Sequence, residues 1–200
     1  MSKPDNHASS MRLFVAVPLP SEIKQVISTW SSILQQQPQF QFRKWVYPED
    51  LHITLQFLGD TRSDRIPYII DGLRTAVTEI TPFQICIESL GTFGRPNFPS
   101  VLWSAIGGEV NQLRFLQEQV VSKLSPLGFA PEERPYHPHL TLARKYNSEV
   151  PLSPSTLTLH QEPSSAEGKP LQWLSDSIVL YATHMHEQPM YEAVTVVRYT

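Results

Sequence analysis

Residues 51–60 read LHITLQFLGD, and this stretch sets the pattern for the chain. Apolar side chains alternate with His52 and Thr54, which predicts a β-strand that buries one face and presents a polar one. A second stretch, RPYHPHLTLAR at 134–144, repeats the histidine and the threonine at the same spacing, again followed by leucine. We therefore asked whether the two stretches belong to a larger repeat.

The segments that precede the two motifs repeat as well. RLFVAVPLP at 12–20 reads as a buried strand, and residues 21–36 carry apolar side chains at helical spacing. VLWSAI, starting at residue 101, reads as a strand, and residues 110–127 read as a helix that stops at Gly128. Strand, helix, proline-marked connector and His-x-Thr-Leu strand thus occur twice, which predicts a duplicated α+β module with a pseudo-two-fold axis.

The two copies are almost evenly spaced. His52 and His139 are 87 residues apart, and the first strands, at Arg12 and Val101, are 89 residues apart. The remaining predicted elements are a helix over 63–80 with Pro67 in its first turn, strands over 83–90, 175–183 and 190–199 with the last two antiparallel, a Gly/Pro loop over 91–100, and a loop-rich segment over 147–170.

Composition sets limits on the class of protein. The chain has 200 residues, enough for one domain, and we expect a disordered leader over 1–10 and a single domain over 11–200. No apolar run predicts a membrane span, and Cys86 is the sole cysteine, so we expect a cytoplasmic protein without disulfides. The net charge of −3 argues against coating long nucleic acids but allows a pocket for one nucleotide or RNA end.

The paired motifs predict phosphoryl chemistry. Residues i and i+2 of a strand point the same way, so each motif presents an imidazole and a hydroxyl to one side. Two such strands facing each other would place two imidazoles on opposite sides of a phosphorus atom, with hydroxyls for its oxygens. In-line displacement needs a base and an acid in that arrangement, and histidine serves as either near neutral pH. One motif alone would more often be a surface strand or a satisfied core histidine.

In these residues the sequence resembles the RNA 2′,3′-cyclic phosphodiesterases, formerly called 2′-5′ RNA ligases, of the two-histidine phosphoesterase superfamily. The resemblance covers most of 11–145, in MRLFVAVPLP, KWVYPEDLHITLQFLGD, VLWSAI and RPYHPHLTLAR. It implies a bilobal α+β fold with two antiparallel sheets facing a central cleft and helices outside. It also implies opening of a 2′,3′-cyclic phosphate at an RNA end, or in a small cyclic nucleotide, to a 2′-phosphomonoester, without a metal or cofactor.

The resemblance also assigns roles to the catalytic pair. By motif position, His52 would protonate the 3′ leaving oxygen and His139 would activate water. A monomer is the default expectation, because the sequence carries no signal of oligomeric state.

Four further residues receive binding roles from the resemblance. Thr54 and Thr141 would hold phosphate oxygens, Arg144 would help to bind the phosphate or nucleotide, and Phe57 would stack on the terminal base. Strict alternation, however, turns Arg144 and Phe57 away from the histidines. They reach the cleft only if the strands end, twist or bulge after Leu142 and Gln56, and Phe57 is equally typical of a core residue.

Other interpretations remain open at this point. His137 with His139, or His184 with His186, could bind a metal ion, although neither pair includes a carboxylate. A catalytically silent module that binds nucleotides or RNA ends is a second alternative. Ligation, the hydrolytic step run backwards with a 5′-hydroxyl in place of water, is a third. Scattered basic residues could guide RNA along the cleft mouth but are equally typical of a solvated surface: Arg43, Lys44, Arg95, Arg134 and Lys145.

Overall fold

The computed structural model describes residues 9–160, 162–164 and 168–200. Of the leader predicted over 1–10, residues 1–8 lie outside the described residues, and the first strand begins at Ser10. In chain order the elements are β1 (Ser10–Pro18), α1 (Ser21–Gln35), β2 (Phe42–Trp45), η1 (Pro48–Asp50), β3 (His52–Arg62), η2 (Ser63–Arg65), α2 (Ile66–Ala76), β4 (Phe83–Arg95), β5 (Phe98–Gly108), α3 (Val110–Leu124), η3 (Ser125–Leu127), β6 (His139–Tyr146), α4 (Pro154–Thr158), β7 (Gln172–Ser175), β8 (Ser177–Thr183) and β9 (Tyr191–Arg198).

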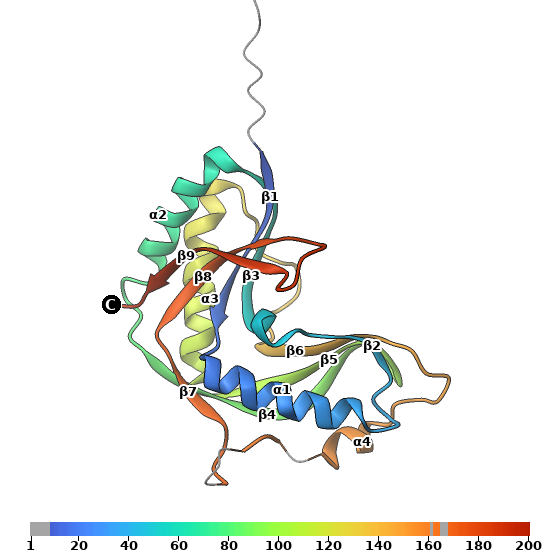
Figure 1. Ribbon diagram of the computed structural model, residues 1–200. Coiled ribbons are helices and arrows are strands. Elements are labelled where there is room, and N and C mark those ends of the chain that lie inside the picture. Colours follow the sequence, from blue (N-terminus) through green and yellow to red (C-terminus); the bar gives the residue numbers. More distant parts are fainter. Residues whose placement is uncertain (1–8, 161, 165–167) are drawn as a thin grey trace, which may run out of the picture.

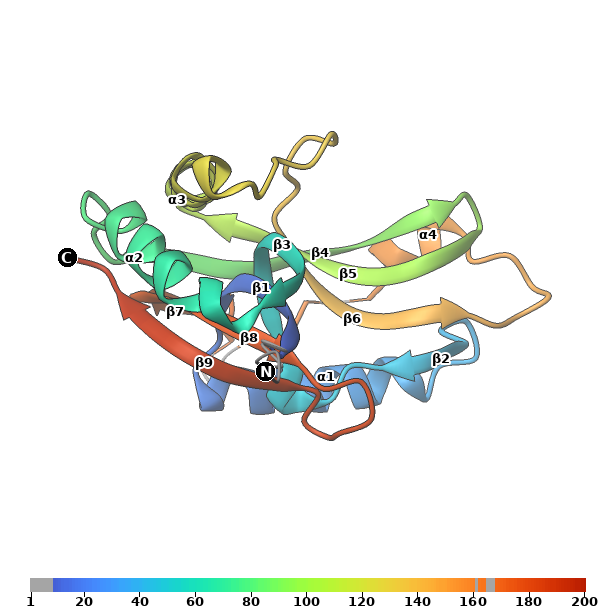
Figure 2. The same cartoon turned by 90° about the horizontal axis from the view of Figure 1, so that it is seen from above.

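The strands form two antiparallel sheets. One has four strands in the order β3-β1-β8-β9, and the other has five in the order β2-β6-β5-β4-β7. Helices α2 and α3 pack against each other and reach β9 and β3, while α4 packs on β4 (Figure 1). Figure 2 shows α2 and α3 on one side of the molecule and β2 at the far end of β6. The predicted α+β fold of two antiparallel sheets is confirmed.

The duplication extends to the hydrogen-bonding register. In the first sheet Pro18 lies opposite His52, and in the second Ala105 lies opposite His139. Adding 87 to each residue number of the first ladder reproduces the second across five pairs: Pro18/His52, Val17/Ile53, Ala16/Thr54, Val15/Gln56 and Phe14/Phe57 become Ala105/His139, Ser104/Leu140, Trp103/Thr141, Leu102/Ala143 and Val101/Arg144. By this register the counterpart of Val101 is Phe14, 87 residues earlier, and not Arg12, which lies 89 residues earlier.

A single hydrophobic core joins the two sheets. The residues that alternate with the histidines are completely buried, for example Ile53 and Leu140, each 0% exposed. These belong to one contiguous cluster with the apolar faces of α1, α2 and α3. Burying each such side chain stabilises the fold by about 1.5–3 kcal/mol, so the apolar face fixes the strand register and thereby the orientation of the polar face.

The predicted Gly/Pro loop over 91–100 is wrong. Strands β4 and β5 continue through most of it as a hairpin that turns between Arg95 and Phe98. Gly91 lies in β4, directly under the Trp103 ring of β5. An added Cβ would meet this ring at 2.2 Å, so the close packing requires glycine. Gly94 has a φ of 112° at an irregularity in the ladder. Both glycines therefore allow the neighbouring strand to pack closely within the sheet, a role that cannot be told from a turn in the local sequence.

Other predicted elements differ only in length. The helix expected over 63–80 is a 3₁₀ turn followed by α2, with Pro67 in its first turn as predicted. The segment over 147–170 is mostly loop and includes the short helix α4, while residues 161 and 165–167 lie outside the described residues. Strands β8 and β9 pair antiparallel as predicted. None of the described helices combines the length and the apolar character that crossing a membrane requires.

Candidate active site

The two histidines are held by identical backbone contacts. Nδ1 of His52 lies 2.7 Å from the carbonyl oxygen of Asp50, and Nδ1 of His139 lies 2.7 Å from the carbonyl oxygen of His137. A carbonyl oxygen can only accept, so Nδ1 must carry the proton in both rings. In each neutral imidazole the lone pair is therefore on Nε2, the nitrogen that a general base uses on the open side of the ring.

The hydroxyls lie beside these nitrogens. Nε2 of His52 is 3.1 Å from Oγ1 of Thr54, which donates a hydrogen bond to the neutral ring. Thr141 occupies the equivalent position on β6. Although β3 and β6 belong to different sheets, Cα atoms of the two strands come within 8 Å of each other. The two His-x-Thr motifs, far apart in sequence, are thus brought side by side, and the charge of His139 acts on the pKa of His52.

A β-bulge follows each motif and changes which way the next residues point. Leu55 and Leu142 are skipped in the ladders, so two consecutive residues are buried in each strand before Phe57 and Arg144 emerge on the exposed side. Phe57 is 59% exposed. The bulges therefore supply the change of direction that the sequence required for both side chains, and the pseudo-symmetry makes Phe57 and Arg144 counterparts.

Arg144 lies close enough to act electrostatically on both histidines. Desolvation is the main cause of the lowered pKa of His52 and of His139, and the positive charge of Arg144 adds to both decreases. On the opposite sheet, desolvation raises the pKa of Tyr191, and the charge of Arg144 opposes that rise. It is exposed, and among the described residues it makes no ion pair with a carboxylate. The site between the two sheets therefore carries an unneutralised positive charge beside two neutral imidazoles, an arrangement suited to an anion.

Burial sets the protonation of the ligand-free site. Desolvation lowers the pKa of His52 from 6.5 to about 4, with the charges of Arg144 and His139 adding to the decrease and the hydrogen bond to the Asp50 carbonyl opposing it. Desolvation also lowers the pKa of His139, where the bond to the His137 carbonyl opposes the shift. Both rings are thus neutral at physiological pH until an anion binds, and a bound anion raises the pKa of a facing imidazole.

Aromatic side chains hold both rings in place. His52 contacts Phe14, Tyr191 and Tyr181 at centroid distances of 4.8, 5.1 and 6.1 Å. His139 contacts Phe93 at 4.9 Å and Trp103 at 6.3 Å. The sequence interpretation did not single out the residues around His52, because β8 and β9 meet β1 and β3 only in the folded chain.

Asp50 is a positioning residue that the sequence interpretation missed. It is only 7% exposed, and its carboxylate accepts hydrogen bonds from the backbone N–H groups of Met190 and Tyr191. Its carbonyl oxygen holds His52 at the same time. Asp50 therefore links the start of β9 to the His52 ring, a role signalled in sequence only by an acidic residue two positions before the motif.

A cavity of about 710 Å³ adjoins the histidine pair. Its walls come from β3, the C-terminal end of β4, α3 and the 131–137 segment, and it reaches Thr54, Phe57 and His139. His52, Thr141 and Arg144 do not line it, so the cavity opens on one side of the pair and does not enclose it. Tyr136 forms part of its wall and donates a hydrogen bond from its hydroxyl to the Thr54 carbonyl at 3.1 Å.

Among the described residues, neither alternative metal pair is joined by enough side chains to hold a metal ion. His137 and His139 lie with ring centroids 6.4 Å apart, and His184 contacts Glu192 at 2.7 Å through Nε2. Across residues 9–160, 162–164 and 168–200, no group of three or more His, Cys, Asp or Glu side chains is placed to hold a metal ion.

The comparisons show which known proteins this chain is similar to. A model of the 2′-5′ RNA ligase superfamily matches residues 14–187. The RNA 2′,3′-cyclic phosphodiesterase of Geobacillus stearothermophilus is 36% identical over 181 residues, which cover 90% of this chain and 55% of that protein, so the chain spans little more than half of that relative's length. The RNA 2′,3′-cyclic phosphodiesterase of Bacillus subtilis is 32% identical over 90% of this chain and 92% of its own length.

Solved structures show the same architecture. E. coli LigT complexed with 3′-AMP superposes with a TM-score of 0.75, at 23% identity, over 96% of this chain and 99% of that one. E. coli LigT complexed with phosphate superposes with a TM-score of 0.70 over 96% and 98%. At this identity the structures bear on the fold, while the sequence matches bear on the family. The chain belongs to the 2′-5′ RNA ligase superfamily.

Proposed function

We propose that this protein hydrolyses the 2′,3′-cyclic phosphate at an RNA end, or in a small cyclic nucleotide, to a 2′-phosphomonoester. The observation that carries the proposal is the paired hydrogen bond from Nδ1 to a backbone carbonyl, 2.7 Å in both motifs. It leaves two equivalent Nε2 atoms on adjoining strands for proton transfer. The relatives named RNA 2′,3′-cyclic phosphodiesterase support the substrate class, and the 2′ product rests on the family resemblance.

The reaction divides between the two histidines. Nε2 of His139 accepts the proton of a water molecule whose oxygen attacks phosphorus, and the bond from phosphorus to the 3′ oxygen breaks. The leaving 3′ oxygen takes a proton from Nε2 of His52. The pKa of His52 lies at about 4 in the ligand-free site, so His52 acquires this proton when the anionic phosphodiester binds. The assignment of acid and base follows the order of the motifs, because their local geometry is the same.

The neighbouring residues bind the phosphate and the nucleoside. Thr54, whose hydroxyl donates to Nε2 of His52 in the ligand-free site, turns to a phosphoryl oxygen, and Thr141 binds another from β6. Arg144 neutralises the phosphate charge. The exposed ring of Phe57 lines the adjoining cavity, whose volume suits a nucleoside, and stacks on the base, which is worth about 1–3 kcal/mol.

Product analysis tests the proposal. Adenosine 2′,3′-cyclic phosphate is incubated with the protein in EDTA, and 2′-AMP is separated from 3′-AMP by chromatography. We expect 2′-AMP, with turnover abolished in His52→Ala and in His139→Ala but unchanged in His186→Ala, whose side chain is exposed on the turn before β9. Nucleotide binding without turnover by the wild type would instead identify a binding module. Full activity of either active-site variant would refute the assigned roles.

We further propose that residues 11–200 form one domain, acting as a monomer in the cytoplasm. The core that spans both sheets supports one folding unit, and the single free cysteine, Cys86, is compatible with a reducing compartment. Size-exclusion chromatography with light scattering and cell fractionation test the oligomeric state and the location. A stable dimer or a secreted protein would contradict this proposal.

A further inference from the structure

Lys44 lies directly across the strand pair from Arg144. Edge strand β2 pairs with β6 so that Lys44 faces Arg144 and, at the next position, Trp45 faces Ala143. Ala143 is 0% exposed and belongs to the core, so Arg144 points to the opposite, cleft side of the sheet. Directly opposed residues share a face, with Cβ atoms about 4.5–5.5 Å apart. Lys44 therefore extends the cleft face of the sheet by one side chain beyond Arg144.

Two facing cations are unfavourable unless an anion lies between or beside them. Like charges directly opposed across a strand pair destabilise it. Both side chains are exposed, and neither forms an ion pair with a carboxylate anywhere in the described part of the chain. The chain carries more Asp and Glu than Lys and Arg, with a net charge of −3. An anion bound between or beside the two side chains would relieve this repulsion.

The position of the pair identifies the kind of anion. Arg144 acts electrostatically on both histidines and so belongs to the cyclic phosphate site. Lys44 lies on β2, the edge strand next to β6 in its sheet, and Figure 2 shows β2 on the side of the molecule away from α3. Arg and Lys side chains at directly opposed positions are long enough to reach neighbouring phosphates of one RNA strand. A strand with its cyclic end between the histidines can therefore bring an internal phosphate to Lys44.

We propose that Lys44 binds an internal phosphodiester of an RNA strand whose cyclic end occupies the histidine site. The inference rests on the proposed function and narrows its substrate: RNA ends are better substrates than mononucleotides, which lack an internal phosphodiester. Because the contact is to the backbone, the preference depends on chain length and salt but not on base sequence.

The experiment compares two substrates at two salt concentrations. The first is adenosine 2′,3′-cyclic phosphate, and the second is a trinucleotide with the same cyclic end. We expect the wild type to have the higher kcat/KM for the trinucleotide, and the ratio of the two values to fall as salt rises. In Lys44→Gln the ratio falls by about fivefold, which corresponds to about 1 kcal/mol, and the salt slope decreases by about 0.7.

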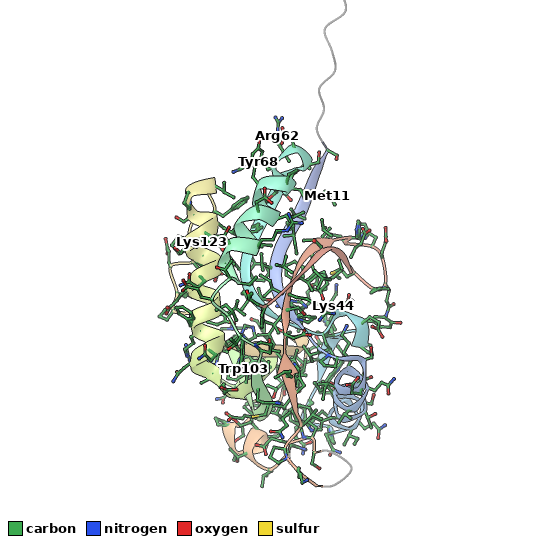
Figure 3. All side chains as sticks on the ribbon, turned by 90° about the vertical axis from the view of Figure 1, so that its left-hand side faces the viewer. Met11, Lys44, Arg62, Tyr68, Trp103 and Lys123 are labelled. Atoms are coloured by element: carbon green, nitrogen blue, oxygen red, sulfur yellow. The ribbon has the colours of Figure 1, made fainter. Side chains whose placement is uncertain are left out.

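A matched control and a binding measurement complete the test. Lys123→Gln removes an exposed lysine from α3, on the other side of the molecule from Lys44 in Figure 3, and should leave the ratio unchanged. A ratio in Lys44→Gln equal to the wild-type ratio would overturn the inference. If the wild type turned over neither substrate, the proposed function would be refuted, but the role of Lys44 in binding would still be open to test. Fluorescence anisotropy with a labelled trinucleotide 2′-phosphate tests that role. We expect Lys44→Gln to bind the trinucleotide more weakly than the wild type does, and equal binding would overturn the inference.

Discussion

The half-buried His52 ring should make the protein less stable in acid, and a single substitution should remove this effect. The pKa of His52 is lowered from 6.5 to about 4 in the folded protein, chiefly by desolvation. As pH falls below 6.5, the unfolded chain binds a proton at this position and the folded protein does not. The contribution of His52 to the free energy of unfolding therefore decreases as the pH falls from 6.5 to about 4, and this contribution changes no further below that.

The size of the effect follows from the shift. Each pKa unit corresponds to about 1.36 kcal/mol, which sets an upper limit of about 3 kcal/mol for this ring. His52 is half-buried and keeps some solvent, so we expect a loss of about 2 kcal/mol between about pH 7.5 and about pH 4.5. His52→Gln removes the titrating ring, while the contribution of every other group, including His139, remains in both proteins.

Urea unfolding followed by circular dichroism measures this difference. The free energy of unfolding is determined at several pH values for the wild type, for His52→Gln and for His186→Gln, which removes an exposed imidazole as a control. The advantage of the wild type over His52→Gln should shrink by about 2 kcal/mol on acidification. A difference that stays constant with pH would show that burial does not depress the pKa of His52, and the reasoning about its protonation by bound substrate would fail.

Three further predictions concern the support of the site. Asp50→Ala leaves the N–H groups of Met190 and Tyr191 without their acceptor and should lower the free energy of unfolding by about 2–4 kcal/mol. Asp50→Asn keeps an acceptor oxygen and should lower it by less. Equal losses for the two variants in urea titrations would refute a hydrogen-bonding role. Gly91→Ala places a Cβ 2.2 Å from the Trp103 ring and should cost about 1–3 kcal/mol with reduced kcat, so an unchanged melting temperature would contradict the packing. Turnover of the cyclic nucleotide should persist in EDTA, because the proposed acid, base and oxygen ligands all come from side chains; complete loss, restored by a divalent cation, would reopen the metal hypothesis.

Local sequence patterns were enough to reveal the repeat and to predict phosphoryl chemistry for it. Alternation of apolar side chains with His52 and Thr54, repeated 87 residues later, is a local property of each strand, because the side-chain period of two assigns one face to the core. Helical periodicity predicted α1, α2 and α3, and each predicted C-terminal end lies within a few residues of the observed one. The glycine signals around residues 91–100 misled, since a glycine covered by a cross-strand ring looks the same in sequence as one in a turn.

The way in which the two motifs come together depends on contacts between strands that are far apart in the chain. The bulges at Leu55 and Leu142 turn Phe57 and Arg144 outward, and a bulge exists only relative to a partner strand. Backbone carbonyls fix the tautomers of both histidines, and no side-chain pattern encodes them. The contacts of the C-terminal strands with His52, and of β2 with Arg144, join segments far apart in the chain. Long-range strand pairing is set by burial summed over the whole core, so these neighbours appear only when the chain is folded.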